Sequence, residues 1–173
     1  MPRRPFRRLG LALALAFALA GQARAGTLPR LEADSLGGTH VVLPRDAAGK
    51  PLVLLLAFTK ESEGDLKLWS RKLIDDRVGD RAAVYVVVVA DKTVFFGHKH
   101  VRNIVEGAGV GSEEQRRTNV LLTFDGTGWR DLVPPGDKTT AGIVVCDASG
   151  SVVFAKREPF NEANLAEVEQ AAK

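Results

Sequence analysis

Two long apolar runs dominate the middle of the chain. Residues 52–58 (LVLLLAF) and 82–90 (AAVYVVVVA) contain almost no polar side chains, a pattern typical of strands that are covered on both faces. Between them the spacing of the apolar residues becomes helical. The order strand, helix, strand predicts a right-handed βαβ unit with parallel strands, in which residues 52–58 are central in the sheet.

The helix between these strands is predicted to run from about Ser62 to Arg77. Ser62 and Asp65 have a spacing compatible with a capping box at its start. At helical spacing, the lysines and arginines of this segment fall outside the face that carries the apolar residues, so one face of the helix is charged and the other is apolar. The apolar face consists of Leu66, Trp69, Leu73 and Ile74.

The C-terminal third predicts a strand, a hairpin and a last helix. Residues 120–124 have the character of a strand or a short extended piece. Residues 142–146 (GIVVC) and 151–155 (SVVFA) flank a turn that ends in glycine, so these two strands should be antiparallel. Asn161 is expected to open the final helix, whose apolar face contains Leu165, Val168 and Ala172.

The other segments have weaker patterns. Residues 26–50 are rich in turn-forming residues around one short apolar piece at 40–43, which predicts an N-terminal hairpin or an extended arm. Residues 101–106 are a candidate helix, residues 107–111 a glycine-rich link, and residues 112–117 a helical turn.

Residues 1–25 have the three parts of a signal peptide. Arg3, Arg4, Arg7 and Arg8 form a positive region, Leu9 to Ala20 is apolar, and Ala23-Arg24-Ala25 fits a cleavage site. The apolar stretch is too short for a membrane span, which needs about 20 helical residues, so we expect no stable membrane anchor. Cleavage near Ala25 would release residues 26–173 as a single domain into the periplasm or the medium.

The export route has two alternatives. Arg3-Arg4-Pro5-Phe6 partly resembles the twin-arginine export motif. A general secretory leader also collects arginines in front of its apolar region. Both routes lead out of the cytoplasm.

The basic character of the chain belongs to this leader. Five of its 24 basic residues fall within the first 25 positions, where there is no acid, which leaves 19 basic against 21 acidic residues in the rest. A phosphate-binding surface inferred from the overall charge would therefore be an artefact, and we expect no nucleic-acid partner.

Two segments resemble the thioredoxin-like, or redoxin, superfamily. Gly49-Lys50-Pro51 and the apolar run after it look like the entry into the first core strand of redoxins, and residues 140–153 are similar to their terminal hairpin. The resemblance covers most of residues 31–172. It implies an α/β thioredoxin-like fold with a central mixed β-sheet flanked by helices, and it does not indicate an activity.

The chain departs from that superfamily at the residues that carry its chemistry. Catalytic members have reactive cysteines just after the first core strand, where the following helix lowers the thiol pKa; this chain has Thr59-Lys60-Glu61-Ser62-Glu63-Gly64 there. Thr139-Thr140-Ala141 replaces the proline that precedes the last hairpin. The chain thus resembles exported bacterial members that lack the active-site cysteines, a likeness that includes residues 101–106 and 154–156. The site is degenerate, and we expect no dithiol or peroxidase chemistry there.

At this degenerate site the charged residues have two interpretations. Glu61 and Glu63 complement the positive N-terminus of the following helix for structural reasons alone. Thr59 and Lys60 could instead bind an anion with the same N–H groups. The two acids weigh against the anion.

Cys146 is the one cysteine of the chain, which excludes an intramolecular disulfide, a CxxC pair and a cysteine-rich zinc site. Free cysteine is among the most buried residue types. We expect a core side chain that packs against the helices covering the sheet and has a raised thiol pKa. The alternative is an intermolecular disulfide, which would make the chain a redoxin-type oxidoreductase or antioxidant protein acting through Cys146.

His98 and His100 would share a face if their segment were a strand. With only His40 elsewhere, a metal site would need carboxylates such as Asp91. We therefore expect a solvated loop without metal, and a metal-handling role through His98 and His100 is the alternative.

These observations favour an exported thioredoxin-fold protein that works as a binding or assembly-support module. We expect no enzymatic activity, no cofactor, and a protein partner that the sequence does not identify. Trp129 and the pair Phe95-Phe96 lie in predicted loops. They are either lids over the edge of the core or exposed contacts for such a partner.

Overall fold

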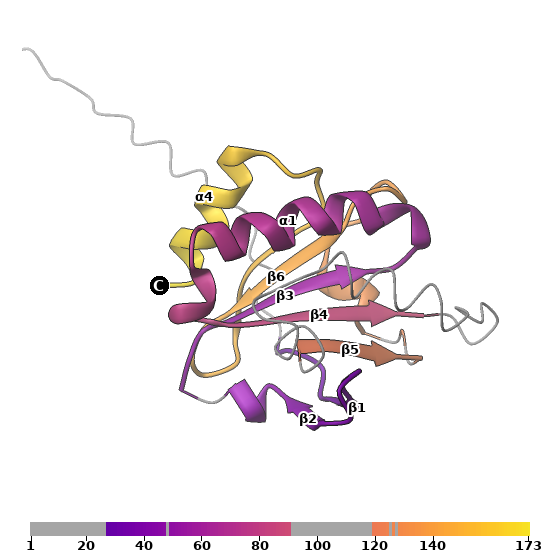
Figure 1. Ribbon diagram of the computed structural model, residues 1–173, viewed down its shortest axis with the longest axis vertical. Helices are drawn as coiled ribbons and strands as arrows, with labels where there is room; N and C mark the ends of the chain where they lie inside the picture. The colour runs from indigo at the N-terminus through magenta and orange to yellow at the C-terminus, as the bar shows by residue number, and fades with distance from the viewer. Residues whose placement is uncertain (1–26, 48, 91–118, 125, 127) are drawn as a thin grey trace, which may run out of the picture.

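A five-stranded mixed sheet lies at the centre of the computed structural model (Figure 1), which describes residues 27–47, 49–90, 119–124, 126 and 128–173. The strands lie in the order β5-β4-β3-β6-β7. β3 (Leu52–Ala57) is the middle strand, and each of its residues is buried because both faces of the sheet are covered. The prediction of a central strand here is confirmed.

Parallel strands form one side of the sheet and antiparallel strands the other. β4 (Ala83–Val89) is parallel to β3, and β5 (Val120–Thr123) is parallel to β4. β6 (Gly142–Cys146) is antiparallel to β3, and β7 (Val152–Lys156) is antiparallel to β6. The predicted βαβ unit and terminal hairpin are both present.

The two predicted helices are present with slightly different bounds. A 3-10 turn, η2 (Lys60–Ser62), leads into α1 (Glu63–Asp75). Past its end Arg77 has a φ of 53°, and a left-handed residue cannot continue a right-handed helix. In α4 (Glu162–Ala171), the Asn161 side chain accepts a hydrogen bond of 2.8 Å from the Asn164 N–H, as the sequence predicts.

Both helices cover the same face of the sheet (Figure 1). They pack against alternate residues of the central strands, because successive side chains of a strand point to opposite faces. The core on this side includes Val53, Leu55, Leu66, Trp69, Leu73, Ile143, Val145, Leu165 and Val168.

The opposite face is covered by the predicted N-terminal hairpin. Its strands β1 (Leu31–Asp34) and β2 (His40–Leu43) are antiparallel and are followed by the short turn η1 (Arg45–Ala47). The core beneath the hairpin includes Leu28, Leu31, Val41, Leu43, Leu52, Leu54, Leu56, Val144 and Cys146.

Several expectations concern residues outside the described ranges. They are the signal peptide at 1–25 and the segments 101–106, 107–111 and 112–117.

Two further 3-10 turns complete the described elements, η3 (Val78–Asp80) and η4 (Arg130–Leu132). Within the described ranges, no helix combines the length and the apolar character that a membrane span requires.

Candidate functional site

The segment that stands where the superfamily has its cysteines lies at the end of β3. Thr59 is extended, with φ −144° and ψ 161°, and is followed by η2 and α1. The loop of residues 137–141 leads into β6, which is the antiparallel neighbour of β3, so this loop faces Thr59. The fold thereby brings Thr59–Glu63 next to Thr139-Thr140-Ala141.

Both hydroxyl groups of this segment donate hydrogen bonds to main-chain carbonyls. Thr59 Oγ1 donates to the carbonyl of Lys138, and Ser62 Oγ donates to the carbonyl of Thr59 at 2.8 Å. Ser62 is fully buried. Thr59 thereby joins this segment to the loop before β6, and Ser62 closes the turn η2 within the segment.

The charged side chains of the segment are largely engaged with lysines. Glu61 Oε1 lies 3.7 Å from Lys138 Nζ, and Glu63 Oε1 lies 2.6 Å from Lys67 Nζ. The main-chain N–H of Glu61 lowers the pKa of its own carboxyl group, and Lys138 lowers it further. The side chain of Lys60 has no hydrogen bond or ion pair with any described residue. The two carboxylates next to Lys60 oppose the binding of an anion there.

Asp65 has a different role from the predicted one. The capping box does not form, since Ser62 makes no side-chain cap. Instead, Asp65 Oδ2 accepts a hydrogen bond of 2.9 Å from the Ala141 N–H, and Oδ1 accepts one of 2.8 Å from the Phe160 N–H. Both donors lie outside regular secondary structure. One carboxylate thus joins α1 to the loop before β6 and to the segment before α4.

Arg157 supports the same loop and was not anticipated from the sequence. Its Nη2 donates to the Asp137 carbonyl at 3.1 Å and its Nε to the Thr140 carbonyl at 3.4 Å. The guanidinium carbon lies 4.8 Å from the centroid of the Phe58 ring, a cation–π distance. Burial lowers the pKa of Arg157, and the nearby Arg130 lowers it further. No local pattern marks this arginine, because its partners come from the loop and from the end of β3.

Cys146 is buried, but on the face of the sheet opposite the helices. It pairs with Leu52 in the register of β3 and β6 and belongs to the core beneath the β1–β2 hairpin. The expectation that its thiol packs against the covering helices is wrong, because the alternation along β6 turns Ile143 and Val145 to the helices. Burial raises the pKa of Cys146 to about 11, and Asp147 contributes to the rise.

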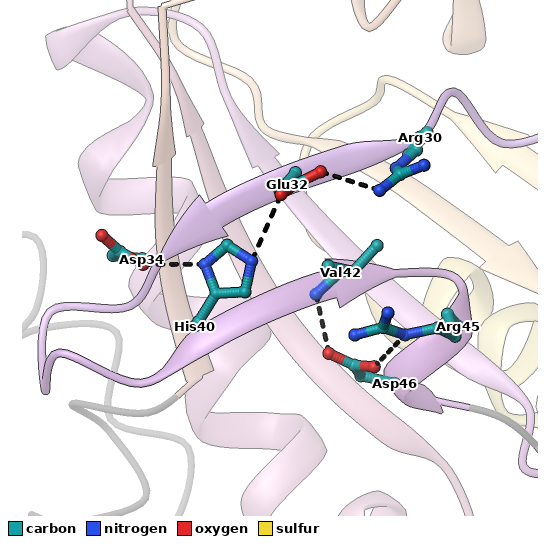
Figure 2. A network of polar contacts seen from close by, with 7 residues as sticks. All are labelled: Arg30, Glu32, Asp34, His40, Val42, Arg45 and Asp46. Atoms are coloured by element: carbon teal, nitrogen blue, oxygen red, sulfur yellow. Dashed lines mark hydrogen bonds and ion pairs between the residues drawn. The ribbon is translucent and has the colours of Figure 1, made fainter.

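His98 and His100 lie outside the described residues, whereas His40 is on the exposed surface of the hairpin (Figure 2). Its Nδ1 is 3.0 Å from Asp34 Oδ1 and its Nε2 is 3.3 Å from Glu32 Oε1, and Arg30 pairs with Glu32 at 2.8 Å. The hydrogen bond to Asp34 raises the pKa of His40. The two carboxylates approach different ring nitrogens, so they do not converge on one cation. Across the described ranges, no cluster of three or more histidine, cysteine or acidic residues could hold a metal.

The aromatic residues singled out in the sequence have different outcomes. Trp129 is 2% exposed and belongs to the core beneath the hairpin, so it is a lid on the core and not an exposed contact. Phe95-Phe96 lie outside the described residues. Phe124, which directly follows β5, is 49% exposed. Sequence reasoning missed it, because the predicted strand at 120–124 included this residue, whereas β5 ends at Thr123.

Comparison with known proteins gives matches among solved structures alone. No protein-family model matches the chain, and no curated protein sequence does. An exposed lipoprotein thioredoxin from Streptococcus pneumoniae is 17% identical over 82% of this chain and 98% of its own, with a TM-score of 0.57. A thioredoxin-family thiol:disulfide interchange protein from Chlorobium tepidum is 15% identical over 87% and 97%, with a TM-score of 0.60.

A third similar structure is that of an assembly protein. BsSco, a member of the Sco family of cytochrome c oxidase assembly proteins, is 10% identical over 88% of this chain and 96% of its own, with a TM-score of 0.58. These likenesses extend over nearly the whole length of each neighbour. The chain therefore has the thioredoxin-like fold, and its single cysteine, Cys146, means that it lacks an active-site cysteine pair.

Proposed function

We propose that this chain is an exported thioredoxin-fold protein that binds another protein and does not carry out dithiol exchange. The observation that carries the proposal is the hydrogen bond from Thr59 to the Lys138 carbonyl. At the position where catalytic members need a reactive thiol, this chain has a side chain that ties two segments together. Asp65 and Arg157 hold the facing loop in place as well.

Export is supported by the sequence of residues 1–25, with its arginines, its apolar run and the small residues around Ala25. Residues 26–173 would then be the mature domain, in the periplasm or secreted. One structural neighbour is an exposed lipoprotein, and another belongs to a family of assembly proteins. The chain has the thioredoxin-like fold but lacks a cysteine pair. A role in supporting the assembly of another protein needs a binding surface and no cysteine pair.

The surface that we assign to the partner is the end of the sheet where β3 and β5 finish, defined by Lys60, Glu61, Lys138 and Phe124. Lys60, Glu61 and Phe124 lie at one end of the sheet because parallel strands have their carboxyl ends together, and Lys138 joins them through its ion pair with Glu61. All four are exposed. Phe124 is the exposed aromatic residue of this surface, and aromatic residues are enriched in protein interfaces.

The first experiment tests the absence of thiol chemistry. The full chain is assayed for reduction of insulin disulfides and for peroxide consumption, next to a Cys146→Ser variant. We expect no turnover by either protein, because the thiol of Cys146 is buried and protonated. Turnover by the wild type that disappears in Cys146→Ser would contradict the proposal and support the redoxin alternative.

The second experiment tests the partner surface. A photoreactive phenylalanine analogue is placed at Phe124 and, as a matched control, at Leu68, which is 51% exposed on α1. We expect one saturable cross-linked protein from the exported fraction at position 124 and none at 68. Equal labelling at both positions would contradict the assignment.

The metal content of the purified chain tests the alternative of a metal-handling protein that uses His98 and His100. Stoichiometric metal would favour this alternative.

N-terminal sequencing of the exported protein tests the compartment. We expect a start at Gly26, next to the small residues of the cleavage site. Recovery of Met1 on the mature protein would contradict export by cleavage. Replacing Arg3 and Arg4 with lysine should slow export strongly only on the twin-arginine route.

A further inference from the structure

The first described residues of the chain are attached to the folded domain. Thr27 pairs with Ser151 in an isolated antiparallel β-bridge. The side chain of Leu28 is 4% exposed and belongs to the core beneath the β1–β2 hairpin. Pro29 packs closely on Gly128, since a Cβ on that glycine would lie 3.2 Å from Pro29 Cγ. Three consecutive residues are therefore fixed in place before β1 begins.

The partners of these residues are themselves held by the fold. Asp147 Oδ1 accepts a hydrogen bond of 3.0 Å from the Ser151 N–H, and the Asp147 N–H donates one of 3.0 Å to the Ser151 carbonyl. Gly128 has a φ of 80°, in the left-handed region that favours glycine. Both contacts join positions far apart in the sequence, so residues 27–29 become attached only when the domain folds.

The predicted cleavage site lies directly in front of this attached segment. In the sequence, Gly26 alone separates the bond after Ala25 from the β-bridge at Thr27. One extended residue spans at most about 3.6 Å. A peptidase takes the chain on both sides of the bond into its active-site cleft, so the residues that follow the bond must be free of other contacts. In the folded domain the attached segment withholds them.

We propose that the docking of residues 27–29 protects the bond between Ala25 and Gly26, so that the leader is removed before this segment docks. The proposal rests on the cleavage near Ala25 that is part of the proposed function. The reaction is a hydrolysis, in which water adds across the peptide bond and leaves a carboxyl group on Ala25 and an amino group on Gly26. Once the precursor has folded, cleavage must wait for the segment to open, and its rate follows the open fraction.

This order of events bears on the export route. The general secretory route exports chains before they fold, so the bond is accessible when the leader reaches the peptidase. The twin-arginine route exports folded proteins, in which residues 27–29 would already be docked. The proposal therefore favours the general secretory route.

The test uses the full-length precursor, folded in mild detergent, and a purified bacterial signal peptidase. Mass spectrometry measures how fast the product that starts at Gly26 appears. The comparison is a precursor with six residues, alternately glycine and serine, inserted between Gly26 and Thr27. The insertion adds about 20 Å of extended chain and removes no side chain of the domain. We expect it to be cleaved at least about tenfold faster than the wild type.

A pair of matched substitutions tests whether local opening controls the rate. Leu28→Ala weakens the docked segment and should speed cleavage of the folded precursor about tenfold. Leu165→Ala is the control, because Leu165 is also 4% exposed but lies in the core on the helix face. It lowers the stability of the whole domain without freeing residues 27–29, and should change the rate by less than about twofold. The insertion tests the proposal even if Leu28→Ala does not fold.

The possible failures are distinguishable. Equal rates for the wild type and the insertion would overturn the proposal and leave cleavage near Ala25 intact. Equal acceleration by Leu28→Ala and Leu165→Ala would also overturn it, because the cleaved form would then be the globally unfolded chain. Absence of cleavage in every precursor would contradict the cleavage site, and with it the export part of the proposed function.

Discussion

The hydroxyl of Thr59 donates a hydrogen bond to the main-chain carbonyl of Lys138, a residue 79 positions further along the chain. This contact joins the end of β3 to the loop before β6. In catalytic proteins of the thioredoxin-like superfamily, which this chain resembles, the segment after the first core strand holds the reactive thiol. Here it holds a donor whose partner is the protein's own backbone, which is why the proposed function is binding and not redox turnover.

Thr59→Val removes this donor and keeps the branched shape of the side chain. We expect the free energy of unfolding to fall by about 1 kcal/mol, the net value of an ordinary hydrogen bond. Urea denaturation measures it, with Thr59→Ser as the matched control that retains the hydroxyl. A Thr59→Val protein as stable as the wild type would show that the contact contributes nothing.

Asp65→Ala should be more costly than Thr59→Val. Loss of the carboxylate leaves the N–H groups of Ala141 and Phe160 without their acceptor, and we expect destabilisation of about 3 kcal/mol. Asp75→Ala, at the end of the same helix and exposed, is the control and should change stability by less than about 0.5 kcal/mol. Similar effects of the two substitutions would contradict the bridging role of Asp65.

Cys146 should resist alkylation in the folded protein. With a pKa of about 11 against an ordinary value of 9.0, the thiolate is about 100-fold scarcer at pH 8 than in an ordinary cysteine. Iodoacetamide labelling followed by mass spectrometry measures the rate, and the same chain in guanidinium is the control. Rapid labelling of the native thiol would instead direct attention to an intermolecular disulfide.

The same shift predicts how stability depends on alkaline pH. The unfolded chain loses the thiol proton first as the pH rises, so the contribution of Cys146 is complete below about pH 9 and is lost as the pH approaches 11. Cys146→Ala should cost about 1 kcal/mol at neutral pH through a small cavity. Its stability should fall less between pH 9 and 11 than that of the wild type.

His40 should titrate above its ordinary pKa of 6.5, mainly because of its hydrogen bond to Asp34. Because the pKa is raised in the folded protein, the ion pair of His40 on β2 with Asp34 on β1 contributes its full stabilisation below about pH 6.5. This stabilisation is lost as the pH rises through the pKa that His40 has in the folded protein. NMR titration of the His40 ring measures this. Asp34→Asn should move the pKa back toward 6.5, whereas Asp75→Asn should not, and an unchanged titration in Asp34→Asn would contradict the assignment.

The elements with strong local patterns could be predicted because their signals are local. The runs at 52–58 and 82–90 became β3 and β4, since a fully apolar segment is stable only when both its faces are covered. Asn161 caps α4 as expected because a cap needs only a side chain and an N–H three residues away. The absence of an active-site thiol at residues 59–64 was likewise determined by the sequence alone.

Only the tertiary structure decided what the polar residues of the site do. Asp65 had the spacing of a capping box, but the fold brings two main-chain N–H donors to it, from residues 76 and 95 positions away. These N–H groups would otherwise lack an acceptor, whereas the N–H groups at the start of a helix can bind water. The carboxylate therefore gains more free energy from the distant donors than from capping the helix. The faces of β6 were also undetermined, since an all-apolar strand has no polar side to orient it. Alternation in the assembled sheet placed Cys146 beneath the β1–β2 hairpin and not beneath the helices.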